Sequence, residues 1–198
     1  AADRADLLGT VIAEAERLNR FIANLLDMTK LESGAVAPNL AAHDLGEVVG
    51  SALQRAATIL GGHRVEVDLA PDLPMLNLDP VLFEQVLFNL LDNAAKYADR
   101  GTVVRIEGWR DGSAVCLRVL DDGPGIADGD LERVFDKFWR ARQADAQRAG
   151  TGLGLAISRG FVEAMGGRIV ARNRADRPGL AVALTMPVAP APGRMEAA

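Results

Sequence analysis

Four polar residues fall on one face of an otherwise apolar stretch, Phe83 to Tyr97, where a buried helix would normally carry none. Their spacing of i, i+4, i+7 and i+8 places them side by side on a helix. They are Asn89, Asn93, Lys96 and Tyr97. A half-buried asparagine must be hydrogen-bonded, because an unsatisfied one costs about 1–3 kcal/mol. We expect a bound ligand or ion to satisfy this face; the alternative is an ordinary polar edge of an amphipathic helix.

A second stretch, DDGPGI from Asp121 to Ile126, directly follows a predicted strand. Gly123 and Gly125 let the backbone approach a flat ligand closely. An ionised carboxylate only accepts hydrogen bonds, so Asp121 would favour the exocyclic amine of adenine over the carbonyl group of guanine. A charged hydrogen bond of this kind contributes about 1.5–3 kcal/mol, which is enough to discriminate between bases. The alternative is a turn that uses glycine for backbone reasons alone.

A third stretch, GTGLGL from Gly150 to Leu155, opens a predicted helix whose free N–H groups and dipole favour phosphate. A dinucleotide-binding fold would need a strand immediately before these glycines, and the polar residues 140–149 stand there instead. One helix terminus contributes only about 0.3–1 kcal/mol, so a triphosphate needs further cationic help. Asn93 offers an amide oxygen to Mg²⁺ and Lys96 offers a charge to phosphate.

Between these glycine stretches lies an aromatic cluster, VFDKFWR at residues 134–140, which leads into the polar segment 140–149. Aromatic anchors beside a polar loop that ends in glycine indicate a hinged lid over the site. Core packing of Phe135 and Phe138 is the alternative, and it is compatible with a lid.

Composition excludes several classes of protein. The 198 residues are 49% apolar and 25% charged, as in one sizeable soluble domain with an appendage. A net charge of −5, with no Lys/Arg block longer than a pair, gives little support for nucleic-acid binding. The single cysteine, Cys116, excludes an internal disulfide, and its alternating apolar context predicts a core position. No apolar run approaches the roughly 18 residues of a membrane span, so we expect a soluble chain.

Residues 3–33 are predicted to form one long helix that ends at Gly34 and Pro38. Its apolar residues alternate in steps of three and four, which is typical of a coiled-coil or bundle seam. The seam consists of Leu8, Val11, Ala15, Leu18, Ile22, Leu25 and Thr29. A single helix cannot bury such a seam, so we expect a partner helix, a second subunit, or both.

A second domain is predicted to begin near Asp44, which caps a helix together with Glu47. Asp111-Gly112 predicts a hairpin between two alternating strands. Predicted helices cover residues 45–60, 83–97, 128–134 and 151–165, and predicted strands cover residues 65–69, 75–78, 102–110, 114–121, 168–173 and 179–186. This order predicts an α+β fold with helices on one face of a mixed, mostly antiparallel sheet. The Ala/Pro-rich residues 189–198 are predicted to be disordered.

In this order and spacing, the stretches resemble the N, G1, F and G2 boxes of the ATP-binding domain of sensor histidine kinases, in the ATPase superfamily that includes Hsp90, DNA gyrase and MutL. This resemblance implies the Bergerat ATP-binding fold, a two-layer sandwich, preceded by one long bundle-type helix. LNRFIANLLDMTKLESG at residues 18–34 resembles the second helix of the dimerisation and phosphotransfer hairpin. EVVGSALQ at residues 47–54 and VFDKFWRA at residues 134–141 are similar to the KdpD-type sensor kinases of bacterial potassium uptake. The implied division is a partial hairpin at 1–34, a linker at 35–43, an ATP-binding catalytic domain at 44–188 and a tail at 189–198.

The resemblance further implies ATP and Mg²⁺ as cofactors. Asn93 would hold Mg²⁺, Asp121 would accept a hydrogen bond from the adenine amine, and Arg140 would reach phosphate from the lid. The other residues implied to contact the nucleotide are Asn89, Lys96, Tyr97, Gly123, Gly125, Ile126, Phe138, Gly150, Thr151, Gly152, Leu153, Gly154 and Leu155.

The implied activity is that of a protein-histidine kinase. We expect the acceptor histidine and its general base to lie outside this chain, because His43 precedes Asp44 without the Thr-Pro pair of the family's acceptor site. The implied partners are a second copy, through the hairpin helices of the full-length protein, and a cognate response regulator, with no nucleic acid. The membrane would be reached only through regions absent from this chain, as in the cytoplasmic portion of a bacterial inner-membrane protein. Two alternatives stay open: a serine-directed kinase of the anti-sigma type and a nucleotide-gated interaction module without phosphotransfer.

Overall fold

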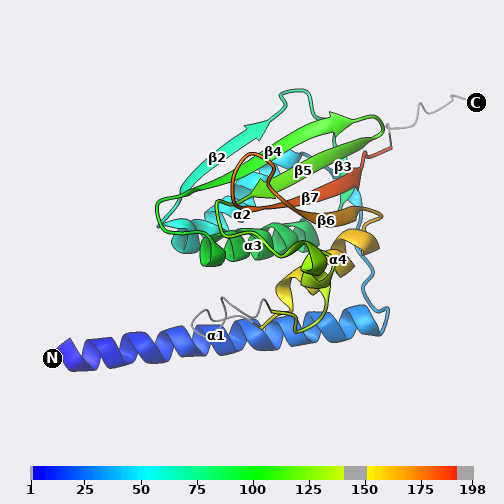
Figure 1. The fold of residues 1–198 in the computed structure, drawn as a ribbon. Coiled ribbons are helices and arrows are strands. Elements are labelled where there is room, and N and C mark those ends of the chain that lie inside the picture. The colour runs from blue at the N-terminus through cyan, green and yellow to red at the C-terminus, as the bar shows by residue number, and fades with distance from the viewer. Residues whose placement is uncertain (1, 141–150, 191–198) are drawn as a thin grey trace, which may run out of the picture.

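A five-stranded sheet is the centre of the domain in the computed structural model, which describes residues 2–140 and 151–190 (Figure 1). The strands are β2 (Arg64–Leu69), β4 (Val103–Asp111), β5 (Ala114–Leu120), β6 (Arg168–Asn173) and β7 (Leu180–Pro187), in the spatial order β2-β4-β5-β7-β6. β2 pairs with β4 in parallel, and the other neighbours in this sheet pair antiparallel. The predicted mixed, mostly antiparallel sheet is therefore confirmed.

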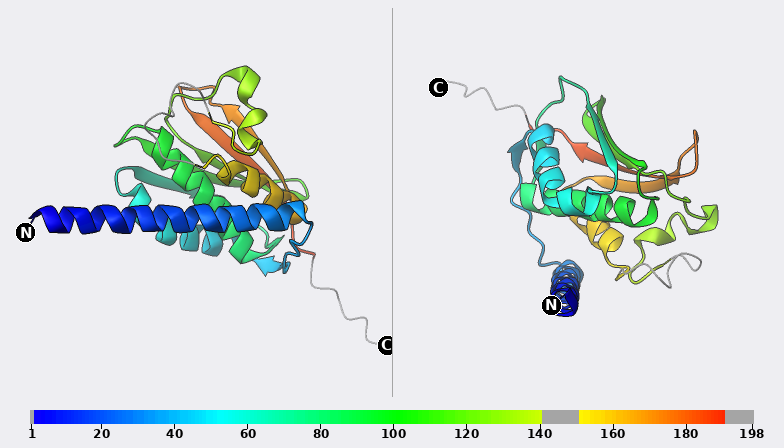
Figure 2. Two further views of the ribbon diagram at one scale, coloured as in Figure 1. Left: turned by 90° about the horizontal axis from the view of Figure 1, so that it is seen from below. Right: turned by 90° about the vertical axis from the view of Figure 1, so that its left-hand side faces the viewer.

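Three helices cover one face of this sheet: α2 (Leu45–Leu60), α3 (Pro80–Tyr97) and α4 (Gly154–Ala164) (Figure 2). Asp44 caps α2 as predicted, because its Oδ1 atom accepts the Glu47 N–H at 3.1 Å. Asp79 caps α3 in the same way, accepting the Val81 N–H at 3.0 Å. The α+β layer arrangement thus follows from capped helices that each bury one apolar face.

The hydrophobic core lies between the helices and the sheet. Its largest fully buried side chains are Leu45, Leu76, Leu78, Phe83, Leu87, Leu91, Ile106, Leu117, Leu153, Ile157, Met165 and Leu184. Each side chain of this size contributes about 1.5–3 kcal/mol when it is buried. Because α3 supplies three of them, this helix is fixed against the sheet, and its polar face has a defined direction.

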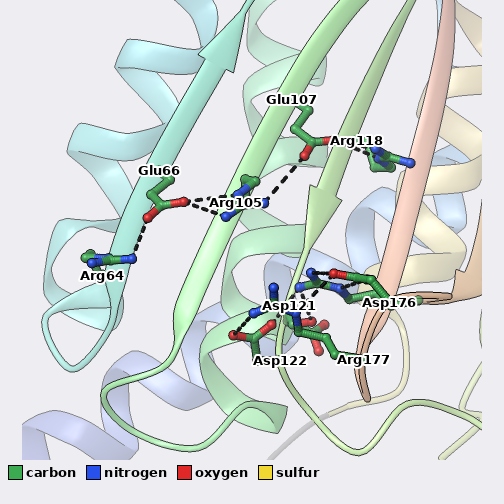
Figure 3. A network of polar contacts seen from close by, with 10 residues as sticks. Arg64, Glu66, Arg105, Glu107, Arg118, Asp121, Asp122, Asp176 and Arg177 are labelled. Atoms are coloured by element: carbon green, nitrogen blue, oxygen red, sulfur yellow. Dashed lines mark hydrogen bonds and ion pairs between the residues drawn. The ribbon is translucent and has the colours of Figure 1, made fainter.

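The opposite face of the sheet carries a row of paired charges from neighbouring strands (Figure 3). Glu66 lies opposite Arg105, with 2.8 Å between its Oε2 atom and the Arg105 Nη2 atom. Glu107 lies opposite Arg118 and pairs with it, and the Arg118 guanidinium lies 5.2 Å from the ring of Trp109. Such cross-strand pairs suit a sheet face that is exposed to water.

Cys116 belongs to this charged face, so the prediction of a core position is wrong. It is half-buried, and its Sγ atom lies 3.8 Å from the Thr185 hydroxyl. Successive residues of a strand point to opposite faces. Since Val115 and Leu117 point into the core, the residue between them must point away.

Three further details differ from the prediction. The last helix begins at Gly154 and not at Thr151. The helix predicted at 128–134 is two short 3₁₀ turns, η1 (Asp128–Asp130) and η2 (Arg133–Phe135). Within the predicted linker, β1 (Ala41–His43) pairs antiparallel with β3 (Leu76–Leu78). The sequence hides β1 because alanine has a low strand propensity.

Two predicted segments fall largely outside the described residues. The polar lid segment lies there from residue 141 to residue 150, and the predicted disordered tail lies there from residue 191. The start of that tail is ordered, however, because the Ala189 N–H donates to the Met75 carbonyl at 2.8 Å.

Helix α1 (Ala2–Glu32) runs beneath the helical layer, and its N-terminal turns extend past the edge of the domain (Figure 1). It ends as predicted at Gly34, whose φ of 67° accompanies a hydrogen bond from the Ala35 N–H to the Lys30 carbonyl. The large apolar residues of the predicted seam are 43–59% exposed, namely Leu8, Val11, Leu18, Ile22 and Leu25. The described residues therefore leave the seam uncovered.

The C-terminal end of α1 packs on α4. A Cβ atom added at Gly160 would lie only 2.7 Å from the Leu31 side chain, so the two helices are in close contact. Glu32 forms an ion pair with Lys137, and Met28 is buried. No helix in the described part of the chain has both the length and the hydrophobicity needed to cross a membrane.

Candidate functional site

A cavity of about 710 Å³ lies between α3, the turn after β5, the start of α4 and α1. Most of the residues predicted to contact a ligand line it. These are Asn89, Asn93, Lys96, Tyr97, Asp121, Gly125, Ile126, Arg140, Thr151, Gly152, Gly154 and Leu155. Segments that lie far apart in the sequence, from α1 to α4, thus meet around one space.

Four predicted residues are placed differently. Gly123 is not among the residues that line the cavity, and its N–H donates to the Asp121 carboxylate at 2.8 Å. Leu153 is fully buried in the core, so its side chain stabilises the fold. Phe138 is 61% exposed and meets the glycine segment through its backbone, donating its N–H to the Gly152 carbonyl at 3.0 Å. Gly150 lies outside the described residues.

Asn93 and Lys96 belong to the polar face of α3, and both line the cavity. Asn93 makes no side-chain hydrogen bond with any residue that the structure describes, so its amide is available to a ligand. Lys96 forms an ion pair with Asp92, one helical turn earlier, and both side chains are partly exposed. The Lys96 charge is therefore partly balanced within the protein.

Asn89 has a different role from Asn93, because the protein satisfies its amide. Its Nδ2 atom donates to the Gly154 carbonyl at 3.2 Å and to the Ser158 hydroxyl at 3.4 Å. Its Oδ1 atom accepts from Gln85 at 3.2 Å. The expectation that a ligand satisfies the whole polar face is thus wrong for Asn89. This residue ties α3 to the first turn of α4.

Asp121 follows β5 and is only 9% exposed. Its Oδ1 atom accepts the Gly123 N–H at 2.8 Å and the Leu180 N–H at 3.2 Å. Burial raises the pKa of this carboxyl, while these two hydrogen bonds and the charge of Arg174 act in the opposite direction. Both hydrogen bonds from described residues reach the same oxygen, which leaves Oδ2 to a ligand in the cavity.

Two glycines of the site are required by the backbone. Gly125 has a φ of 74°, and a Cβ atom there would lie 2.8 Å from the Asn173 side chain. Gly152 has a φ of 69°, and a Cβ atom there would lie 2.8 Å from the backbone of Phe138. Other residues would be strained at both positions. The glycines therefore shape the cavity wall whether or not they touch a ligand.

The first residues of α4, Gly154 and Leu155, line the cavity. Thr151 accepts the Leu153 N–H at 3.2 Å, and the helix then begins at Gly154. The first amides of a helix lack intrahelical partners and favour anions. The positive φ of Gly152 keeps the preceding residues out of the helix, which explains why it starts later than predicted.

Two groups of site residues were missed by the sequence analysis. Asn173, the last residue of β6, accepts the Ile126 N–H at 2.8 Å and donates to the Ile126 carbonyl at 2.6 Å. Phe21, Asn24 and Asp27 of α1 line the cavity from the other side. Burial raises the pKa of Asp27, and the nearby Lys30 charge lowers it. No local signal marks either group, because both reach the site through tertiary contacts.

Residues with metal-binding chemistry are sparse. The described residues contain no cluster of three or more His, Cys, Asp or Glu side chains that could hold a metal ion. Mg²⁺, however, usually takes one or two protein ligands and completes its shell with water and phosphate oxygens. The available amide oxygen of Asn93 fits such a site.

Comparison with known proteins gives a consistent result. Residues 78–190 match the family described as "Histidine kinase-, DNA gyrase B-, and HSP90-like ATPase". Sensor protein KdpD of Escherichia coli (strain K12) is 40% identical over 173 residues, which cover 87% of this chain and 19% of that protein. The chain thus spans about a fifth of that relative's length.

Two solved structures are similar in fold. The mycobacterial sensor histidine kinase MprB has 29% identity and a TM-score of 0.67, covering 77% of this chain and 99% of that one. Full-length ShkA in complex with AMPPNP has 26% identity and a TM-score of 0.76, covering 93% of this chain and 39% of that one. The predicted α+β fold is the one found in histidine kinase catalytic domains.

Proposed function

The chain belongs to the histidine kinase-, DNA gyrase B- and HSP90-like ATPase family, and on this premise we propose that it is the ATP-binding catalytic part of a KdpD-type sensor histidine kinase. It binds ATP and donates the γ-phosphoryl group to a histidine on a separate hairpin helix. One observation carries the proposal: Asn93, Asp121 and the start of α4 line a single cavity.

The base lies at the Asp121 end of the cavity. The Oδ2 atom of Asp121 accepts the exocyclic amine of adenine, since its other oxygen is already bonded to two backbone amides. Guanine presents a carbonyl oxygen at that place, which an ionised carboxylate repels. The buried position of Asp121 strengthens this discrimination because water competes little there.

The triphosphate lies at the other end, between α3 and the first amides of α4. Asn93 holds Mg²⁺ through its amide oxygen, and the amides that begin at Gly154 face phosphate oxygens. When bound, Mg²⁺ neutralises charge on the phosphates, which is the main requirement of phosphoryl transfer. Lys96 and Arg140 line the same cavity and add positive charge.

Helix α1 corresponds to the second helix of the dimerisation and phosphotransfer hairpin, with the catalytic domain at residues 44–188. Its uncovered apolar seam supports pairing with hairpin helices of the full-length protein. We further propose a response regulator as the next phosphoryl acceptor, and a membrane location that depends on regions outside this chain. The similarity to sensor protein KdpD supports both assignments.

The proposal is tested by supplying the expected acceptor. The purified chain is mixed with Mg²⁺-ATP and with a hairpin fragment that bears the acceptor histidine, and the products are analysed for acid-labile, base-stable phosphate. We expect transfer that requires both Mg²⁺ and the histidine. ATP binding without any transfer would favour a nucleotide-gated interaction module instead.

A further inference from the structure

The tip of the β6–β7 hairpin, residues 174–179, packs on the turn that carries Asp121 (Figure 3). At its centre is Arg174, whose side chain is only 5% exposed. Its Nε and Nη2 atoms donate to the two carboxylate oxygens of Asp176 at 3.0 and 2.7 Å. Its Nη1 atom donates to Asp122 at 2.6 Å and to the Asp121 carbonyl at 3.3 Å. One guanidinium thus joins the hairpin tip to the turn.

The hairpin backbone also lies directly on the turn. A Cβ atom at Gly179 would lie 2.1 Å from the Asp121 carbonyl oxygen, so only glycine permits this approach. The Asp121 N–H donates to the Leu180 carbonyl at 3.0 Å, and the Leu180 N–H donates back to the Asp121 carboxylate at 3.2 Å. The position of the carboxylate therefore depends on where the hairpin sits.

The side chain of Asp121 is oriented through one of its oxygens. Oδ1 is held by an amide from its own turn and by an amide from the hairpin. Fixing Oδ1 also fixes the direction of Oδ2. Arg174 is not among the residues that line the cavity. It nevertheless binds both segments that supply these amides: the Asp121 carbonyl and the Asp122 carboxylate of the turn, and the Asp176 carboxylate of the hairpin tip.

We propose that Arg174 is a positioning residue for base recognition: by clamping the hairpin tip to the turn, it aims the Asp121 carboxylate at the exocyclic amine of adenine. This inference rests on the proposed function, because it assumes that Asp121 contacts the base. It assigns a determinant of nucleotide specificity to a residue outside the binding cavity.

The chemistry of arginine suits this position. A planar guanidinium presents its donors in a fixed fork, so it can serve acceptors on two segments and hold them at a set angle. A lysine would supply the same charge without that geometry. The charge itself also matters, because three carboxylates surround it: Asp121, Asp122 and Asp176. Without Arg174, the Asp122 charge would act more strongly on Asp121, opposed by the backbone hydrogen bonds from Gly123 and Leu180, and would favour its protonated form.

The test is a double-mutant cycle between Arg174 and Asp121. ATP and GTP affinities are measured by competition with a fluorescent nucleotide for the wild type, Arg174→Met, Asp121→Asn and the double variant. We expect Arg174→Met to weaken ATP binding about tenfold and GTP binding less than about twofold, since the change acts through one base contact. In the Asp121→Asn background, Arg174→Met should then change neither affinity, because residues that act through one contact are non-additive.

A purely structural role predicts other results. Equal loss of ATP and GTP affinity, or a full additional loss in the double variant, would overturn the inference. Arg174→Lys keeps the charge and guards against misfolding of Arg174→Met; we expect the same selective loss of ATP affinity, about threefold, because the fork is missing. A wild-type ATP-to-GTP ratio in Arg174→Lys would equally overturn the inference. Arg172→Met, at an exposed position of β6 two residues before Arg174, is the matched control and should have the wild-type ATP and GTP affinities.

The Asp121→Asn variant separates this inference from the function on which it rests. If Asp121→Asn retains the wild-type ATP-to-GTP ratio, the adenine contact itself is wrong. If Asp121→Asn lowers the ratio of ATP affinity to GTP affinity while both Arg174 variants keep the wild-type ratio, the adenine contact stands and only the role of Arg174 is wrong.

Discussion

Two walls of the cavity carry polar groups: the turn after β5 and helix α3. They differ in whether the protein itself supplies the hydrogen-bond partners of these groups. In the turn after β5, protein groups hold the polar atoms: two amides hold Asp121, and Asn173 holds both backbone groups of Ile126. On α3, Asn93 has no hydrogen-bond partner among the described residues. Under the proposed function, the protein already holds most polar atoms of the base end and leaves the Oδ2 atom of Asp121 to the base, whereas the Asn93 amide at the phosphate end depends on what binds there.

This difference separates two kinds of mutational effect. At the base end, a change disturbs bonds that exist before ligand binding, so selectivity and stability both respond. At Asn93, a change removes an amide that has no hydrogen bond to residues 2–140 or 151–190, so affinity should respond and stability should not. Asn89 is the useful intermediate, because it lies on the wall of the phosphate end but is satisfied by the protein.

The largest effect is expected for Asn93→Ala. Loss of the amide that we propose binds Mg²⁺ should lower Mg²⁺-dependent ATP affinity by at least about 100-fold, since the loss of even a supporting residue of a metal site lowers affinity about 10–100-fold. The melting temperature should not change. Calorimetric titration with and without Mg²⁺ measures the effect, and Asn19→Ala on the exposed surface of α1 is the matched control. Unchanged affinity would remove Asn93 from the metal site.

Asp121→Asn should have the next largest effect. The proposed charged hydrogen bond to adenine would contribute about 1.5–3 kcal/mol, so ATP affinity should fall roughly 10–100-fold while GTP affinity falls much less. Competition between ATP and GTP for the same site measures the ratio. A retained preference for ATP would place base recognition elsewhere in the cavity.

Acidification should weaken ATP binding through the same carboxyl. Because burial raises the pKa of Asp121, it protonates at a higher pH than an exposed Asp, and a protonated carboxyl is a poorer acceptor. Affinity should therefore fall as the pH falls through the raised pKa, by at most the loss seen in Asp121→Asn. Asp121→Asn serves as the reference, because the pH dependence of its ATP affinity should reflect only the titration of the nucleotide. The same pH dependence in the wild type and in Asp121→Asn would contradict the prediction.

The titration of Asp121 itself should not unfold the protein as the pH falls. A carboxyl whose folded-state pKa is raised favours the folded state below its unfolded pKa, and this contribution is lost as the pH rises through the folded pKa. Asp121 therefore makes the free protein more stable, not less, in the pH range where ATP binding weakens.

The smallest effect on binding is expected for Asn89→Ala. It should destabilise the fold by about 1–3 kcal/mol, because it breaks the buried bonds between α3 and α4. For a chain of this size, each kcal/mol lowers the melting temperature by roughly 2–4 °C. Thermal unfolding measures this, and ATP affinity should fall much less than in Asn93→Ala. A large loss of affinity at an unchanged melting temperature would show that Asn89 contacts the ligand directly.

Local patterns were enough to predict most of the elements. Hydrophobic periodicity gave α1, α2 and α3 and the strands of the main sheet, and Asp44 gave one helix start, because these signals lie within a few residues of one another. Strand β1 had no such signal. Cys116 was placed on the wrong face because an apolar residue in an alternating run can point either way.

The cavity was predicted in part for the same reason. Asn93, Asp121 and Gly152 stood out because a polar group in an apolar helix, a carboxylate after a strand, or a glycine before a helix is visible in the sequence. Arg174 and Asn173 did not stand out, since they look like ordinary polar residues of a hairpin. Their partners lie about fifty residues away in the chain.

The sequence by itself determined which residue types could recognise a base, a metal ion and phosphate, because those properties belong to the side chains and their local spacing. Only the tertiary structure decided which of them remain available to a ligand. Asn89 and Asn93 lie one turn apart on the same helix and look alike in the sequence. Packing of α4 against α3 satisfies the amide of Asn89 and leaves that of Asn93 facing the cavity.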